Sequence, residues 1–236
     1  MSKGKVSIVV PMYNEQESLE ILYQELNRVT DTIKDYEFEY LFVNDGSKDN
    51  TLQEIQRLAT ADDRVRYVSF SRNFGKEGAV FAGIAQAEGD CIAVMDCDLQ
   101  HPPETLIKMY RLWEDGYQVI EGVKASRGRE SFIHKMFAKT FYSIISDATG
   151  IDMSRASDFK LMDRQAAEEF LKLPERNVFF RALSSWVGFK TTYVEFDVQE
   201  REAGESKWSF KSLVRYAVNN ITSFSAAPMQ IVTFFG

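Results

Sequence analysis

The sequence predicts an α/β fold in which a mostly parallel central sheet is covered by helices on both faces. Short apolar runs of strand length alternate with longer stretches in which apolar residues recur at helical spacing. Each strand candidate in the N-terminal half is nearly all apolar, which indicates burial on both faces and is typical of parallel strands. A chain of 236 residues with 44% hydrophobic content suits one large domain with a substantial core.

The first strand and helix are predicted from an apolar run that is followed by helical periodicity. Val6–Val10 forms the apolar run, and Pro11 ends it. Apolar residues then recur at helical spacing over Leu19–Ile33, and Ser18 is available to cap that helix. The intervening "PMYNEQE" is therefore predicted to be a loop at the carboxyl end of the strand.

Three more strands are predicted before the middle of the chain. Tyr40–Val43 is a buried strand, "NDGS" is a turn, and Asn50 or Thr51 begins a helix that runs to about Ala59. The segment "RVRYVSFS" is the third strand, and a helix over Ala79–Ala87 follows "NFGKEG". The fourth strand is "CIAVMD".

The pattern changes after residues 117–121. The segment 132–145 has a wide apolar face beside basic residues, so both core packing and an interfacial membrane helix remain open for it. "SDFKLMDR" predicts a short strand that enters a helix, and "TTYVEFDVQER" predicts a later strand.

Composition excludes several classes of protein. A net charge of -7 argues against a general nucleic-acid binder. Cys91 and Cys97 have no zinc or disulfide spacing around them, which favours buried thiols in a reducing compartment. The N-terminal segment has too few apolar residues before Pro11 for a signal peptide, so we expect the chain to begin in the cytosol.

The C-terminal segment differs from the rest of the chain. Residues 216–236 carry no charged side chain, but two asparagines and Pro228 weaken the segment as a complete membrane span. We expect a catalytic domain over 1–210, followed over 211–236 by a juxtamembrane amphipathic helix and the start of a truncated transmembrane region.

Polar clusters follow the predicted strands: "PMYNE", "NDGSKDN", "SRNFGKEG" and "DCDLQ". Ligands of parallel sheets bind at the carboxyl ends of the strands. Asp96 and Asp98 would repel each other unless a positive group lies between them, and this predicts a metal ion. Asp98 and Gln100 alternate along a backbone that we expect to be extended, so both could face one Mg²⁺ or Mn²⁺, which prefer oxygen ligands.

The first loop excludes the common nucleotide folds. "PMYNEQE" lacks the glycine-rich turn of a dinucleotide-binding fold, and no G-x-x-x-x-G-K-[ST] loop is present. What remains is an aromatic ring at Tyr13, carboxylates at Glu15 and Asp45, and the acidic pair. This set suits a nucleotide sugar whose diphosphate is bridged to the protein by a divalent ion.

Five segments in order, "VSIVVPMYNE", "FVNDGSKDNT", "SRNFGKEGA", "DCDLQHPPE" and "REAGESKWS", resemble family 2 inverting glycosyltransferases with the GT-A fold. The resemblance is to the polyprenyl-phosphate subgroup, which includes the dolichol-phosphate mannose synthases and the bactoprenol glucosyltransferases. The resemblance covers nearly the whole chain, whereas a lone D-x-D motif would be weak evidence for the family.

The resemblance implies roles for individual residues. Those expected to bind the nucleotide sugar are Pro11, Tyr13, Glu15, Asp45, Lys76 and Asp96. Those expected at the metal and diphosphate are Asp96, Asp98 and Gln100. Those expected to hold phosphates, including that of the acceptor, are Arg127, Arg129, Arg201, Ser206 and Lys207. Asp158 matches the carboxylate proposed as catalytic base in the family, and Asp98 is also expected to be catalytic. For Lys76 an alternative to donor binding stays open, in which it only shapes its loop and the following helix.

The chemistry of a phosphate acceptor puts a general base in question. A monoalkyl phosphate has a second pKa near 6 and is largely dianionic at neutral pH, so little deprotonation is needed. Asp158 could instead orient a sugar hydroxyl or stabilise positive charge on the sugar. We expect direct in-line attack by the lipid phosphate with inversion, and no covalent sugar–enzyme intermediate.

Donor and location follow from the same resemblance. "ITSFSAAP" and "SKWS" are closer to bactoprenol glucosyltransferases that use UDP-glucose than to enzymes that use GDP-mannose. A polyprenyl-phosphate mannose synthase and a non-catalytic nucleotide-sugar-binding membrane scaffold remain alternatives. We expect a multi-pass protein whose catalytic part lies at the cytoplasmic face of the membrane, with a homo-oligomer as an open option.

Overall fold

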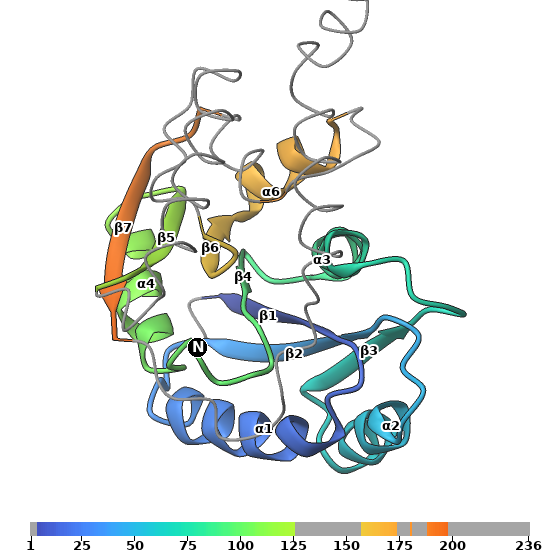
Figure 1. The fold of residues 1–236 in the computed structure, drawn as a ribbon. Coiled ribbons are helices and arrows are strands. Elements are labelled where there is room, and N and C mark those ends of the chain that lie inside the picture. Colours follow the sequence, from blue (N-terminus) through green and yellow to red (C-terminus); the bar gives the residue numbers. More distant parts are fainter. Residues whose placement is uncertain (1–3, 126–156, 174–179, 181–187, 198–236) are drawn as a thin grey trace, which may run out of the picture.

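A single seven-stranded sheet organises the part of the chain that the structure describes, which is residues 4–125, 157–173, 180 and 188–197 of a computed structural model (Figure 1). The strand order is β3-β2-β1-β4-β6-β5-β7. β1 pairs in parallel with β2 and β4, β2 with β3, and β5 with β7, whereas β6 is antiparallel to β4 and β5. The prediction of a mostly parallel sheet is confirmed.

The elements alternate along the chain. The strands are β1 Lys5–Met12, β2 Glu37–Asn44, β3 Val65–Ser69, β4 Cys91–Val94, β5 Val119–Lys124, β6 Lys160–Asp163 and β7 Thr191–Phe196. The helices are α1 Gln16–Thr30, α2 Thr51–Ala61, α3 Lys76–Gln86, α4 Thr105–Glu114 and α6 Arg164–Leu171.

Helices cover both faces of the sheet, as predicted. One core cluster joins α1, α2 and α4 to one set of strand residues, such as Ile8, Tyr40 and Ala93. The second cluster joins α3 and α6 to the alternate set, such as Val9 and Ile92. Successive strand residues point to opposite faces, so the apolar strands supply both cores.

β1 continues through Pro11 to Met12, beyond the predicted end of the strand. The C=O of Val9 accepts the N–H of Met95 at 3.1 Å, and this is the last bond from β4 along this strand. Pro11 has the same parity as Val9, so its missing N–H faces the side on which β4 has already ended. A proline is therefore tolerated in this central strand without loss of a sheet hydrogen bond.

Two helices begin one turn earlier than the sequence predicted. α1 starts at Gln16, and its N-cap is Glu15, whose C=O accepts the N–H groups of Ser18 and Leu19. Ser18 is buried in the first turn, so its prediction as the cap was wrong. α3 starts at Lys76 rather than Ala79. Apolar periodicity locates a buried face but not the polar first turn that precedes it.

The structure has a further helix, α4, over Thr105–Glu114, where none was predicted. Leu106, Met109 and Tyr110 form its buried side at helical spacing. The paired prolines stand just before it, and the C=O groups of Pro102 and Pro103 accept the N–H groups of the first helical residues. The prolines thus begin a helix rather than end a strand.

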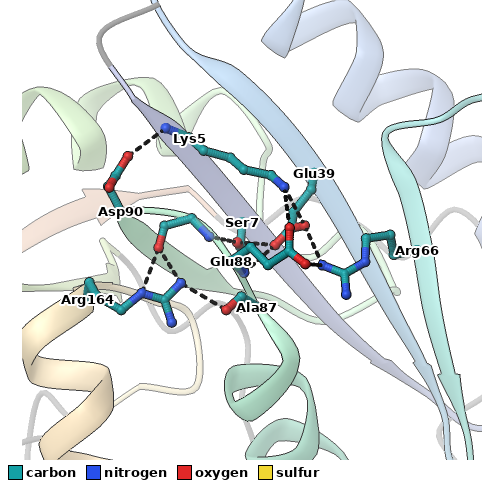
Figure 2. Close-up of polar contacts among 9 residues, drawn as sticks. Lys5, Ser7, Glu39, Arg66, Ala87, Glu88, Asp90 and Arg164 are labelled. Carbon is teal, nitrogen blue, oxygen red and sulfur yellow. Dashed lines mark hydrogen bonds and ion pairs between the residues drawn. The ribbon is translucent and has the colours of Figure 1, made fainter.

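The amino-terminal edge of the sheet holds a charged network around Glu39 (Figure 2). This buried carboxylate contacts Lys5 at 3.1 Å and Arg66 at 3.0 Å, and it accepts the N–H of Glu88 at 2.7 Å. Arg164 of α6 donates to the C=O of Ala87 at 2.9 Å after α3. The network joins strands β1, β2 and β3 to the turn before β4.

Several sequence predictions fall outside the described residues. These are the helix over 132–145, the C-terminal segment 211–236 and the domain boundary at 210. Among the helices that the structure describes, none has the length and apolarity needed to cross a bilayer.

Candidate active site

The carboxyl ends of three neighbouring strands bring the predicted site residues to one edge of the sheet. β1 lies between β2 and β4. The N–H of Asp45, after β2, donates to the C=O of Met12 at the end of β1, at 2.8 Å. Asp96 follows β4 by two residues. The loops after β1, β2 and β4 are therefore adjacent.

The loop after β1 is bonded to the loop after β2. The N–H of Asn14 donates to Ser47 Oγ at 3.0 Å, and the N–H of Glu15 donates to Thr51 Oγ1 at 2.9 Å. Asn14 has a φ of 56°, a left-handed conformation that asparagine tolerates better than most residues. The half-buried Tyr13 directly precedes these two anchored residues.

Asp45 is buried and fixes the loop that leads into α3. Its Oδ1 accepts the N–H of Phe74 at 2.6 Å, and its Oδ2 accepts the N–H of Gly75 at 2.9 Å. Gly46 has a φ of +66°, and a Cβ there would lie 2.4 Å from the carbonyl carbon of Arg72. The backbone of this loop is thus packed directly against the turn after β2, which requires glycine. A contact between Asp45 and a nucleoside stays a prediction.

Lys76 joins two carboxylates that are far apart in the sequence. Its Nζ lies 2.6 Å from Asp96 Oδ1 and 2.8 Å from Asp158 Oδ2. The Asp158 side chain is 9% exposed, while those of Lys76 and Asp96 are 34% and 30% exposed. Burial would raise the pKa of Asp96, but the Lys76 ammonium outweighs it and lowers that pKa. The positive group beside Asp96 in this structure is therefore Lys76.

The backbone after Asp96 turns instead of continuing as a strand. The N–H of Gln100 donates to Asp98 Oδ1 at 3.2 Å, and Leu99 has a φ of 59°. The expectation that Asp98 and Gln100 alternate along an extended backbone was wrong. An aspartate that accepts the N–H two residues later stabilises a turn, which here follows the end of β4 at Val94.

His101 joins the two segments that carry Asp96 and Asp158. Its Nδ1 accepts the N–H of Asp96 at 3.4 Å, and its ring stacks on Phe159 with centroids 4.8 Å apart. Burial lowers the pKa of His101 although Asp96 opposes the shift. A neutral ring with an unprotonated Nδ1 fits this hydrogen bond.

Sequence reasoning missed a buried ion pair beside Asp158. Lys160 Nζ lies 3.4 Å from Glu121 Oε1, and both side chains are at most 1% exposed. Glu121 Oε2 also accepts the N–H of Ser157 at 3.2 Å. The available signal was a charged residue between apolar neighbours, Glu121 after Ile120 and Lys160 between Phe159 and Leu161, because such residues are rarely buried without a partner.

The described residues contain no group of three or more His, Cys, Asp or Glu side chains placed to hold a metal ion. The oxygens that the sequence predicts as metal ligands are those of Asp96, Asp98 and Gln100. Two carboxylates and an amide suit Mg²⁺ or Mn²⁺ when the phosphates of a substrate complete the coordination. The predicted set fits such an ion by its chemistry, and its ligation stays a prediction.

The residues that were predicted to hold phosphates lie outside the described part of the chain. They are Arg127, Arg129, Arg201, Ser206 and Lys207.

Comparison with known proteins gives the family. The model of glycosyl transferase family 2 matches residues 7–171. The chain belongs to glycosyl transferase family 2. The match includes β1 from Ser7 onward, every strand from β2 to β6 and the Lys76, Asp96 and Asp158 cluster. The predicted family is confirmed.

Relatives within the family cover nearly all of the chain. The uncharacterized glycosyltransferase YkcC of Bacillus subtilis is 43% identical over 98% of this chain and 71% of its own length. The bactoprenol glucosyl transferase of Shigella phage SfX is 39% identical over 98% of this chain and 76% of its own length.

Solved structures confirm the GT-A fold. Glucosyl-3-phosphoglycerate synthase from Mycobacterium tuberculosis is similar with a TM-score of 0.63 and 18% identity, over 94% of this chain and 79% of that one. Its structures include complexes with Mn²⁺ and UDP-glucose and with Mg²⁺ and UDP.

Proposed function

We propose that this glycosyltransferase moves glucose from UDP-glucose to a polyprenyl phosphate at the cytoplasmic face of a membrane. The observation that carries the proposal is the Lys76 bridge between Asp96 and Asp158 at the carboxyl edge of the sheet. In a family 2 chain that is 39% identical to a bactoprenol glucosyl transferase, this cluster supplies opposed charges where a sugar diphosphate would lie.

The loops after β1 and β2 would bind the nucleoside. Tyr13 offers an aromatic face, and the bonds from Asn14 and Glu15 to the β2 loop pre-organise it. Pro11 shapes the strand end, and Asp45 supports the loop that leads to Lys76.

The site residues would stabilise charge on the leaving diphosphate. A divalent ion held by Asp96, Asp98 and Gln100 would supply charge neutralisation for the diphosphate. Lys76 would donate a charge-assisted hydrogen bond to a phosphate oxygen of the donor. Both effects lower the barrier to departure of the nucleotide.

The acceptor needs cations more than it needs a base. Its phosphate is largely dianionic at neutral pH, so the proposed roles of Arg127, Arg129, Arg201, Ser206 and Lys207 are to bind and orient it. Asp158 would then stabilise positive charge at the anomeric carbon or orient a sugar hydroxyl. The segments 132–145 and 211–236 are proposed to keep the site at the membrane surface.

The test is transfer of labelled sugar to a short-chain prenyl phosphate by the purified chain with Mn²⁺. UDP-glucose, UDP-N-acetylglucosamine and GDP-mannose are compared as donors, and we expect UDP-glucose to be used best. Asp98→Ala should abolish transfer, whereas Asp63→Ala, an exposed aspartate before β3, should not. Tight binding of UDP-glucose without transfer would instead support the non-catalytic scaffold, and preferred use of GDP-mannose would support a mannose synthase.

A further inference from the structure

Lys76 occupies a position where a cation is needed in the absence of substrate. Asp96 follows β4 and Asp158 precedes β6, and their carboxylates both lie within 2.8 Å of the Lys76 Nζ. Without a positive group between them, two carboxylates this close would repel each other. Lys76 therefore keeps the two sides of the site together.

The same carboxylate cannot serve Lys76 and a divalent ion equally well. Both Asp96 oxygens lie within 2.8 Å of the ammonium. A metal ion on Asp96 would replace this contact and would place two positive charges beside a third. Asp98, two residues later, adds a carboxylate, but the protein still supplies few ligands in comparison with a dedicated metal site.

Exposure indicates which of the two contacts can be exchanged. The Asp96 side chain is 30% exposed, so an ion from solvent can reach it, whereas Asp158 is nearly closed at 9%. Lys76 is the first residue of α3, and its long, flexible side chain is 34% exposed. Lys76 can thus leave Asp96 for a phosphate oxygen while it keeps its contact with Asp158.

We propose that Lys76 is an internal counter-ion that competes with the divalent metal for Asp96, so that metal and nucleotide diphosphate bind as a strongly coupled pair. This inference rests on the proposed function. The diphosphate supplies the negative charge that lets Lys76 and the metal occupy the site together. In the absence of nucleotide, the metal must displace Lys76 and binds weakly.

The proposal is tested by Mn²⁺ binding to the purified chain, followed by electron paramagnetic resonance of the free ion with and without UDP. In the wild-type chain we expect UDP to tighten Mn²⁺ binding strongly. Lys76→Met removes the competing charge, so Mn²⁺ alone should bind about tenfold more tightly, with a correspondingly smaller gain from UDP. Lys76→Arg keeps the charge and should keep the strong coupling.

Two controls make the outcome specific. Lys48→Met removes an exposed positive charge from the loop before α2 and should leave Mn²⁺ affinity within about twofold, because exposed charges are screened. Asp96→Asn should weaken Mn²⁺ binding in every background. Unchanged or weaker binding of Mn²⁺ alone by a Lys76→Met variant that is folded at the assay temperature would overturn the proposal.

The readout separates this inference from the proposed function. Mn²⁺ and UDP binding do not involve the lipid acceptor or sugar transfer. Coupled binding without any transfer would retain the counter-ion and reject the transferase activity. Transfer with uncoupled metal binding would do the reverse.

Discussion

At the scale of single residues, the site depends on carboxylates that have already been given partners by the fold. Asp45 accepts two backbone N–H groups, and Asp158 shares Lys76 with Asp96. Each carboxylate therefore combines an architectural contact with its predicted chemical role. Isosteric amide variants separate the two, because they keep the shape and change the charge or the acceptors.

Asp158→Asn is expected to lower turnover about 100-fold while UDP-glucose affinity changes by less than about threefold. The amide cannot stabilise positive charge on the sugar, whereas the nucleoside loops follow β1 and β2, which β4 separates from β6 and the preceding Asp158. Single-turnover transfer and calorimetric binding of UDP-glucose measure the two quantities. Unchanged turnover would remove Asp158 from the catalytic residues.

Asp45→Asn is expected to weaken UDP binding more than it lowers the transfer rate at saturating donor. The amide has one acceptor oxygen in place of two, so one N–H of Phe74 or Gly75 loses its partner, at a cost of about 1–3 kcal/mol. Thermal unfolding and UDP titration measure this effect. Asp63→Asn, in an exposed turn, is the matched control; an equal effect there would reject the role of Asp45.

At the scale of elements, β6 determines where Asp158 lies, because this strand runs antiparallel between β4 and β5. Its register sets Lys160 opposite both Val94 and Glu121. The segment just before it therefore places Asp158 next to the end of β4. The buried Glu121 and Lys160 pair fixes both ends of this short segment, through Lys160 and through the N–H of Ser157.

Single substitution of this pair should destabilise the chain strongly. Glu121→Gln or Lys160→Met leaves a buried charge without its ion-pair partner, at a cost of about 3–5 kcal/mol. The double variant should lose less than the sum of the two single variants, as measured by urea unfolding. Additive losses would show that the two side chains act independently.

At the scale of the whole molecule, two polar networks lie at opposite edges of the sheet. The carboxyl edge carries the active site, and the amino edge carries the network around Glu39, which connects three strands (Figure 2). Burial would raise the pKa of Glu39, but the Glu88 N–H, Ser7, Lys5 and Arg66 outweigh it and lower that pKa. The folded state therefore favours the ionised carboxylate.

The free energy of unfolding should consequently fall as the pH is lowered. The folded pKa lies below the ordinary value of 4.5, so the stabilisation by Glu39 is present above that value and is lost as the pH falls through the folded pKa. Glu39→Gln should flatten this dependence in urea unfolding between about pH 5 and pH 3. Glu37→Gln, exposed on the same strand, should not; equal slopes in all three proteins would contradict the assignment.

Local patterns in the amino-acid sequence predicted the alternation of strands and helices, the family, and the strand ends at which polar residues gather. These features depend on periodicity and on short motifs, which can be recognised without knowledge of tertiary contacts. The sequence did not reveal the polar first turns of α1 and α3, because buried periodicity ends where solvent begins. Nor did it reveal that Asp98 bends its own backbone.

The position of Lys76 between Asp96 and Asp158 follows from the tertiary structure and not from any local sequence pattern. The three residues come from a helix start and from the loops beside two antiparallel strands, 20 and 82 residues away from the lysine. Their meeting depends on strand order and on the register of β4 with β6, which no local pattern specifies. The long-range pairing of strands, and not the motif, therefore brings the positive charge of Lys76 into contact with the two carboxylates.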